Sequence, residues 1–203
     1  MTELPTRTLT RSGDATEAAE AARTADIAAM RAIQRGDRNA FREFFFRQKV
    51  SVYNYLLRGT RSRATAEDLT QETFTRVAKG VKTWEPKGTV RGWLFAIARN
   101  VLIDHARAVA ARPRLLDVEV PDEPCPTIHP DLVLVLREAL LACIYGLSED
   151  HREVFVLFHV SGLTLTEIAD ACGIPLGTAK SRLASANKNV RSGLIEKGIR
   201  PEL

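Results

Sequence analysis

The sequence predicts an all-α protein of two small helical domains joined by an extended, acidic, proline-rich linker, the C-terminal domain being a helix-turn-helix. Three observations predict this fold class. Apolar residues recur at helical spacing through residues 26–112 and again through residues 132–203. A proline-rich stretch separates these two ranges. Neither range contains a convincing alternation of apolar and polar residues, which is the pattern typical of a half-buried β-strand.

The first domain follows residues 1–25, which lack an apolar stripe and are expected to form a mobile N-terminal tail. Residues 26–112 are expected to form four helices, each with apolar residues on one face. In chain order, these faces are Ile27, Met30 and Ile33; Phe41, Phe44, Phe45, Val52, Tyr55 and Leu56; Leu69, Thr73, Val77 and Val81; and Leu94, Ile97 and Val101. Thr65 is predicted to cap the third helix, with Asp68 as its capping-box partner.

The linker is expected at residues 113–131, which carry five acidic residues and one arginine and hold too much proline for a helix. The domain boundary therefore falls here. Residues 132–203 are expected to form four further helices, with the apolar faces Leu132, Leu136, Leu140, Cys143 and Leu147; Val154, Leu157 and Phe158; Leu165, Ile168, Ala169 and Cys172; and Ala179, Leu183, Ala186, Val190 and Leu194. Ser148 is predicted to cap the second of these helices, and Thr164 and Glu167 form a capping box for the third.

Composition and charge exclude several classes of function. The three cysteines form no CxxC pair and the four histidines have no metal-ligand spacing, so we expect no disulfide framework, no metal site and no cofactor. The N-terminus has no signal-peptide segment and no stretch could span a membrane, so we expect a cytoplasmic protein. Residues 26–112 carry a net charge of +9, the linker −4, and residues 132–203 zero. The basic first half favours a polyanionic partner, although a solvated basic surface has the same charge.

A helix-turn-helix is predicted around residues 173–186, GIPLGTAKSRLASA, where a turn with glycine and proline joins a short helix to the last helix. The second helix of this motif enters the major groove of DNA with its N-terminal residues at the base edges. Arg182 can bind guanine through two hydrogen bonds, and Lys180 can reach guanine or phosphate. Thr178 and Ser181 are small enough to let the backbone approach the DNA.

Charge supports this orientation of the motif. Residues 148–170 hold five acidic residues and one basic residue, whereas residues 171–200 hold six basic residues and one acidic residue. The cationic side of the domain is therefore the side of the recognition helix, where Gly177 also offers a backbone amide to phosphate. The alternative is an ordinary helical hairpin with a solvated outer face.

The first half carries a different signal for nucleic acid. The helix predicted at residues 90–112, VRGWLFAIARNVLIDHARAVAAR, interleaves arginines with aromatic residues. This combination suits single strands, because bases stack on aromatic rings while phosphates meet cations. Trp93 and Phe95 lie either on such a surface or in the core, and both interpretations stay open. Residues 66–77, AEDLTQETFTRV, form the most acidic patch of this half and fit either a solvated helix or a protein-docking face.

These three segments, in this order, resemble bacterial RNA polymerase sigma factors of the small two-domain extracytoplasmic-function (ECF) group. Residues 66–77 look like the family's polymerase-binding helix, and RGWLFAIARNVLIDHAR looks like its promoter-melting helix. LSEDHREVFVLFHVSGLTLTEIADACGIPLGTAKSRL looks like its C-terminal helix-turn-helix domain. The resemblance implies a region 2-like domain at residues 26–112 and a region 4-like domain at residues 132–203.

The resemblance also implies roles for individual residues. The residues expected to dock on core RNA polymerase are Asp68, Leu69, Gln71, Glu72 and Phe74. The residues expected to engage the minus-ten element as a single strand, with one flipped base, are Lys82, Trp84, Lys87, Arg91, Trp93, Arg99, Asn100 and Arg107. The residues expected to read the minus-thirty-five element as duplex are Gly177, Thr178, Lys180, Ser181, Arg182, Lys188 and Arg191. Lys188 and Arg191 are included because Ser185 and Asn187 stand where the family usually has arginines.

Three hypotheses follow for the function. The resemblance implies promoter-specific initiation with core RNA polymerase and promoter DNA, with no catalysis by the chain itself and with an anti-sigma factor as a common partner in the family. A regulator that binds DNA as a homodimer through the helix-turn-helix alone is the main rival. An adaptor that binds only protein is a third, and the polarised recognition helix argues against it. An enzyme is least favoured, because Asp104 and His105 are neighbours in a helix and point apart.

Overall fold

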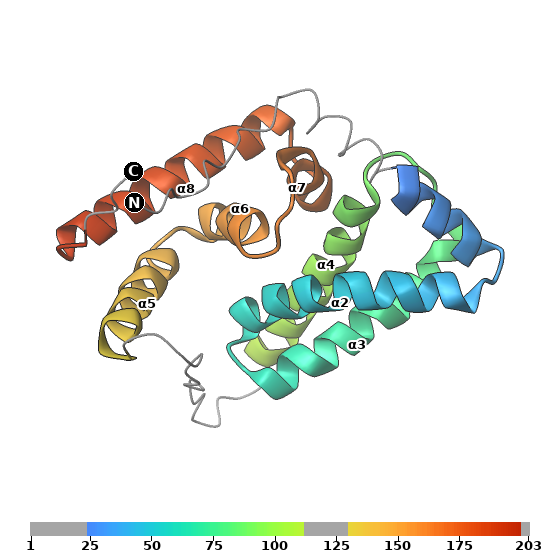
Figure 1. Ribbon diagram of the computed structural model, residues 1–203, viewed down its shortest axis with the longest axis horizontal. Helices are drawn as coiled ribbons and strands as arrows, with labels where there is room; N and C mark the ends of the chain where they lie inside the picture. Colours follow the sequence, from blue (N-terminus) through green and yellow to red (C-terminus); the bar gives the residue numbers. More distant parts are fainter. Residues whose placement is uncertain (1–23, 112–129, 200–203) are drawn as a thin grey trace, which may run out of the picture.

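The computed structural model describes residues 24–111 and 130–199, so nearly all of the expected tail and linker lies outside the described residues. Every regular element in these two ranges is helical, as the sequence predicts, and no strand occurs in them (Figure 1). After a helical segment at residues 24–34, the elements are α2 (Arg38–Thr60), α3 (Arg63–Gly80), the 3-10 helix η1 (Val81–Thr83), α4 (Val90–Ala110), α5 (Pro130–Tyr145), α6 (Glu149–His159), α7 (Leu165–Cys172) and α8 (Leu176–Glu196). None of the described helices has the length and apolar character that a membrane crossing requires.

In the first half, α2, α3 and α4 pack against one another. The sequence places α3 correctly, but the predicted cap of this helix is wrong. Ser62 is the N-cap, and its hydroxyl accepts a hydrogen bond from the backbone N–H of Thr65 at 3.3 Å. The reason is the preceding residue: Arg61 ends α2 in the left-handed conformation, with a φ of 55°, and Ser62 is then the first residue with the extended backbone that an N-cap needs.

In the second half, local sequence signals set the ends of the helices. The predicted capping box is present, because the Glu167 carboxylate accepts a hydrogen bond from the Thr164 N–H at 2.8 Å and Thr164 accepts one in return. Gly173 ends α7 with a φ of 66°, a conformation that glycine adopts at little cost. Ser148 is the N-cap residue of α6 as predicted, but its hydroxyl bonds the His151 ring instead of the backbone. The residues of α8 that are buried are Ala179, Leu183, Ala186 and Val190.

The apolar face predicted for α5 is only partly buried. Leu147 is in the core, but Leu136 and Leu140 are 47% and 37% exposed, so their predicted burial is wrong. The physical reason is the position of the helix: α5 packs mainly on α8, with Cys143 seated close to Gly193.

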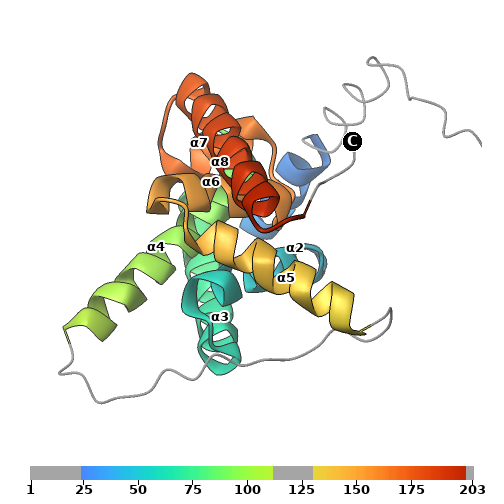
Figure 2. The ribbon, with the colours of Figure 1, turned by 90° about the vertical axis from the view of Figure 1, so that its left-hand side faces the viewer.

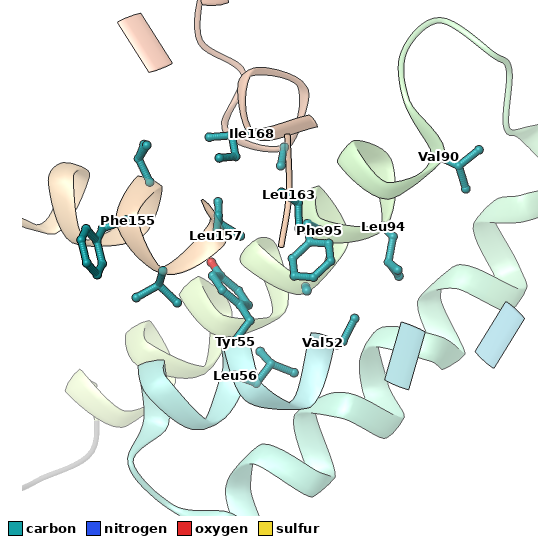
Figure 3. Close-up of a cluster of buried hydrophobic side chains, with 14 of the residues drawn as sticks. Val52, Tyr55, Leu56, Val90, Leu94, Phe95, Phe155, Leu157, Leu163 and Ile168 are labelled. Carbon is teal, nitrogen blue, oxygen red and sulfur yellow. The ribbon is translucent and has the colours of Figure 1, made fainter. Parts of the chain in front are cut away.

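The two halves of the chain are in direct contact. Buried side chains from both form one continuous apolar cluster, in which Tyr55 and Phe95 lie close to Leu157, Leu163 and Ile168 (Figure 3). The helix α7 packs against α4, and Figure 2 shows α6, α7 and α8 stacked above the helices of the first half. The two helical domains that the sequence predicts therefore also pack directly on each other in this structure.

Phe95 is one of the buried residues of this shared cluster. It lies off the stripe of α4 that was predicted to face the first-half core, yet its side chain is 0% exposed and its ring meets that of Tyr55 at 5.7 Å in an edge-to-face arrangement. A helix with a second apolar face needs a second packing partner. For Phe95, the core interpretation is the correct one.

Candidate nucleic-acid interface

A cavity of about 630 Å³ opens between the end of α3, the loop after η1 and the outer face of α4. It is lined by Arg76, Gly80, Thr83, Trp84, Glu85, Lys87, Trp93, Ile97 and Asn100. Four residues predicted for the minus-ten element, Trp84, Lys87, Trp93 and Asn100, thus come together here. We call this the two-tryptophan cavity, because the rings of Trp84 and Trp93 lie edge to face with their centroids 6.4 Å apart.

Local packing holds the two rings in place. The Gln34 side-chain amide donates to the backbone carbonyls of Val81 and Trp84 at 3.0 and 2.8 Å, which ties the loop to the N-terminal helical segment. Gly80 lets the Trp93 ring approach, since a Cβ at this position would lie 3.3 Å from that ring. Trp84 is 7% exposed and belongs to the apolar core, so only part of its ring can serve a ligand. Trp93 is the more accessible of the two rings.

The cavity combines stacking surface, hydrogen-bonding groups and positive charge. Asn100 offers an amide donor and acceptor, which can pair with the edge of a base. Arg76 donates hydrogen bonds to Glu72 at 2.8 Å and to Asp104 at 2.9 Å. The bond to Glu72 is the main cause of the raised pKa of Arg76, so the guanidinium stays charged. Lys87 pairs with Glu85 on the exposed rim. These groups suit an unpaired, planar, polar ligand with a nearby anion.

Two other residues predicted for the minus-ten element, Arg91 and Arg99, point to the second half of the chain instead. Arg91 donates to the carbonyls of Ser161 and Gly162 at 2.8 and 2.9 Å and lies 3.4 Å from the Glu167 carboxylate. These carbonyls belong to the connection between α6 and α7. The backbone of α4 thus presents the cavity residues on one face and Arg91 on another.

Arg99 binds Glu153 of α6 at 2.7 Å, and the same carboxylate oxygen accepts a hydrogen bond from the Tyr55 hydroxyl at 3.2 Å. Burial lowers the pKa of Arg99, but the bond and the charge of Glu153 outweigh burial and raise it overall. Burial, followed by the charge of Glu153, raises the pKa of the Cys172 thiol to about 12. The Cys172 thiol is therefore protonated and unreactive near neutral pH.

The remaining residues predicted for this element, Lys82 and Arg107, do not line the two-tryptophan cavity. Lys82 lies on η1 and lines a second cavity instead, while Arg107 is exposed in the last turn of α4. The structure therefore brings together half of the eight residues.

The helix-turn-helix presents most of its predicted DNA contacts to solvent. Lys180 and Ser181 are exposed near the start of α8, and Gly177 has open space beside its Cα. Lys188 and Arg191 are exposed further along α8. Thr178 and Arg182 are partly covered, and the guanidinium of Arg182 is paired with the Asp150 carboxylate in the first turn of α6.

Two of the five residues predicted to dock on polymerase, Gln71 and Phe74, line an apolar groove between α2 and α3. This groove has a volume of about 650 Å³ and is lined by Phe41, Phe45, Gln71, Phe74, Thr75, Ala78, Lys79 and Lys82. Asp68 and Glu72 are exposed on the same helix as Gln71 and Phe74, and Leu69 is half-buried. Sequence reasoning missed Phe41 and Phe45 as groove residues, because their spacing fits a core stripe equally well.

Two family models match the chain. Sigma-70 region 2 matches residues 45–112, and Sigma-70 region 4 matches residues 137–189. The RNA polymerase sigma factor CarQ from Myxococcus xanthus is 35% identical over 164 residues, which cover 79% of this chain and 92% of that protein. The ECF RNA polymerase sigma factor SigL from Mycobacterium tuberculosis is 32% identical over 150 residues, which cover 73% of this chain and 85% of that protein. The chain belongs to the ECF RNA polymerase sigma factors.

One further relative bears a sigma factor name, and two solved structures share the fold of this chain. A probable RNA polymerase sigma-C factor from Mycobacterium bovis is 38% identical over 125 residues, which cover 60% of this sigma factor and 66% of the relative. The structure of CnrH in complex with the cytosolic domain of CnrY has the same fold, with a TM-score of 0.65 and 21% identity over 85% of this chain and 98% of that chain. The sigma factor RpoE from Bartonella quintana, in complex with the anti-sigma factor NepR, matches with a TM-score of 0.57 and 21% identity over 76% and 96% of the two chains.

Family membership gives the coarse function. Sigma factors support promoter-specific initiation of transcription with RNA polymerase, and they are DNA-binding initiation factors, not a family of enzymes. The two-tryptophan cavity of this sigma factor falls within the region 2 match, and the start of α8 falls within the region 4 match.

Proposed function

We propose that this sigma factor captures the minus-ten element as a single strand, with one base in the two-tryptophan cavity, and reads the minus-thirty-five element as duplex with the exposed face of α8. The observation that carries the proposal is the cavity itself, with Trp84, Trp93 and Asn100 on its wall. The proposed partners are core RNA polymerase and promoter DNA, and the proposed location is the cytoplasm. An anti-sigma factor is a third proposed partner, since RpoE was solved with one.

Energetics support capture of an unpaired base. Flipping a base out of a duplex costs a few kcal/mol, and stacking it on an aromatic ring returns roughly 1–3 kcal/mol. A cavity that adds an amide for the base edge and cations for the phosphates can therefore offset much of the cost of melting. Binding alone can then favour the open promoter, and polymerase supplies the chemistry of RNA synthesis.

Exposed polar residues near the start of α8 support readout of duplex DNA by this helix. Replacing Arg182 by alanine is expected to weaken discrimination at one base pair of the minus-thirty-five element by roughly 1–3 kcal/mol, because a bidentate contact to guanine would be lost. In the structure Arg182 is held by Asp150, so the side chain must exchange this carboxylate for a base edge on binding. Competition binding of the holoenzyme to promoters mutated at single positions measures this effect.

Arg191→Ala is the matched control, because it removes a cation from the exposed side of the same helix further from the turn. It is expected to weaken binding evenly across promoter sequences and to reduce the dependence of binding on salt. If the Arg182→Ala variant has the same sequence preference as wild type, Arg182 does not read a base.

The groove between α2 and α3 supports docking on polymerase, because its surface combines apolar and polar side chains. Asp68 is exposed on α3, the helix that also contributes Phe74 to the apolar wall of the groove. Reversing its charge in an Asp68→Lys variant is expected to weaken association with core polymerase by about tenfold or more, since like charges across an interface repel. Glu196→Lys, on the exposed end of α8, is the control. Surface plasmon resonance measures the affinity of both variants for core polymerase. If Asp68→Lys binds as tightly as the control, Asp68 is not part of the docking site.

In vitro transcription tests the proposed function as a whole. Purified core polymerase on a promoter library is expected to initiate specifically only when this sigma factor is added, and the sigma factor alone is expected to bind duplex promoters weakly. Strong binding of a homodimer to a palindromic duplex without polymerase would instead identify a regulator that uses the helix-turn-helix alone. Failure to initiate on any template would contradict the proposal.

A further inference from the structure

A hydrogen bond joins the end of α6 to the exposed side of α8. Nε2 of His159, the last residue of α6, lies 2.9 Å from Oδ1 of Asn187. Because an amide oxygen can only accept, Nε2 of the imidazole carries the hydrogen of this bond. The rings of Phe155 and Phe158 lie 4.4 and 5.0 Å from the His159 ring, centroid to centroid. His159 is exposed, so the bond and the two rings hold an imidazole in place at the surface of the protein.

Asn187 lies in a row of α8 side chains that includes two cations. Lys180, Asn187 and Arg191 follow one another at spacings of seven and four residues, which places them on one side of the helix. All three are exposed. A helix rises 1.5 Å per residue, so the row is about 16 Å long and can meet more than one phosphate of a DNA backbone. Asn187 adds no charge to this row, whereas the histidine bonded to it can add one.

The charged groups of α8 near this bond are positive. Lys188 and Arg191 are the charged residues closest to Asn187 along α8, and both are exposed. Within α6, the five residues that precede His159 are uncharged. Among the residues that the structure describes, no carboxylate pairs with His159. An anion that approaches this part of α8 therefore meets cations and a histidine without an internal acidic competitor.

The other elements packed against α6 are α7 and α2, and their titratable groups are engaged elsewhere. Asp170 of α7 accepts hydrogen bonds from the backbone N–H and the hydroxyl of Thr89, the N-cap of α4, at 2.8 and 2.9 Å. The remaining pairs are Glu167 of α7 with Arg91, and Tyr55 of α2 with Glu153. These partners leave the charge of His159 to be decided by solvent pH and by what binds at α8.

We propose that His159 is a pH-dependent DNA contact, whose protonated ring binds a backbone phosphate of the minus-thirty-five duplex beside α8. This inference rests on the proposed function, because it takes α8 as the helix that lies on duplex DNA. Since Asn187 holds Nε2–H, the proton gained on acidification goes to Nδ1 and supplies both a positive charge and a second donor. A phosphate stabilises the protonated ring, so the contact is present at low pH and is lost as the pH rises. Phosphate contacts carry no sequence information, so His159 strengthens binding to every promoter alike.

Three variants separate the charge of His159 from its structural role. His159→Gln keeps an amide that can bond Asn187 but never carries a charge. His159→Arg carries a permanent positive charge. His151→Gln is the matched control, because it removes the other histidine of α6, which bonds Ser148 at the opposite end of the helix. Far-UV circular dichroism checks that each variant is folded.

The measurement is the affinity of the holoenzyme for a fluorescent promoter duplex, by anisotropy at low temperature, where the complex stays closed. Each variant is compared with wild type at the same pH, so the pH dependence of polymerase itself cancels. At about pH 6, His159→Gln is expected to bind about three- to tenfold more weakly than wild type. Its plot of log affinity against log salt is expected to be shallower by about 0.9, the value for one phosphate contact. At about pH 8 both differences are expected to vanish, because the wild-type ring is then neutral.

The other two variants and a second promoter complete the test. His159→Arg is expected to bind as wild type does at about pH 6 and more tightly than wild type at about pH 8, whereas His151→Gln follows wild type at both values. If His159→Gln matches wild type at the lower pH, or is weaker by the same factor at both, His159 makes no charged contact and the inference is overturned. The proposed function survives that result as long as substitutions in the minus-thirty-five element still weaken wild-type binding. If those substitutions have no effect while the pH-dependent loss remains, base readout by α8 is overturned and the phosphate contact of His159 stands.

Discussion

A Trp93→Ala variant is expected to slow promoter opening by about 5- to 150-fold while leaving closed-complex formation nearly unchanged. The reason is that Trp93 is the accessible ring of the two-tryptophan cavity, and stacking of one base on an aromatic ring is worth roughly 1–3 kcal/mol. That stacking exists only after the strands separate, so its loss falls on the opening step. Permanganate reactivity of unpaired thymines in the promoter measures opening, and gel shift at low temperature measures the closed complex.

Trp93→Phe is the matched control, because it keeps an aromatic face in the same position. It is expected to recover most of the opening rate that alanine loses. Trp93 also packs against the apolar core, so the alanine variant must first be shown to keep its helical circular dichroism. Unfolding of the variant, or equal loss of closed and open complexes, would assign Trp93 to the core and remove it from DNA capture.

A Phe95→Ala variant is expected to lower the free energy of unfolding by about 3–5 kcal/mol, the cost of a large cavity in a packed core. Phe95 is 0% exposed and lies between Tyr55 of α2 and Leu163 of the second half (Figure 3). Because the shared cluster couples the halves, the wild-type chain is expected to unfold in one cooperative transition. Urea denaturation followed by circular dichroism measures both the midpoint and the number of transitions.

Phe46→Ala is the control for this variant, since Phe46 is 65% exposed and its truncation is expected to change stability by less than about 0.5 kcal/mol. Two separate transitions in the wild-type chain would mean that the halves fold independently. In that case the stability lost in the Phe95→Ala variant would be confined to the unfolding of the first half, and the shared core would contribute little to stability.

Local features of the fold could be predicted well from the sequence. The capping box of Thr164 and Glu167, the end of α7 at Gly173 and the buried face of α8 are all set by residues within a few positions of one another. Ser62 shows the limit of this reasoning. Thr65 and Ser62 are both acceptable caps, and only the left-handed turn at Arg61 decides between them.

The candidate sites could be predicted in part. The sequence places Trp84, Trp93 and Asn100 within reach of one another, because a loop and one helical face connect them. It does not reveal that Arg91 and Arg99 turn toward the second half. An arginine that stays exposed and an arginine that binds a carboxylate far away in the sequence have the same local sequence pattern, so the partners of Arg91 and Arg99 could not be inferred.

By itself, the sequence determined the helices, their order, the helix-turn-helix and the family, since these depend on periodicity, caps and motifs that are local in the chain. Only the tertiary structure decided that the two halves share a core and that Asp170 caps α4 across 81 positions of sequence. The physical reason is that packing depends on which faces are left uncovered once the helices have formed. Phe95 and Leu140 are both apolar residues on helices, yet the first is 0% and the second 37% exposed, because the packing of the helices decides which faces are covered.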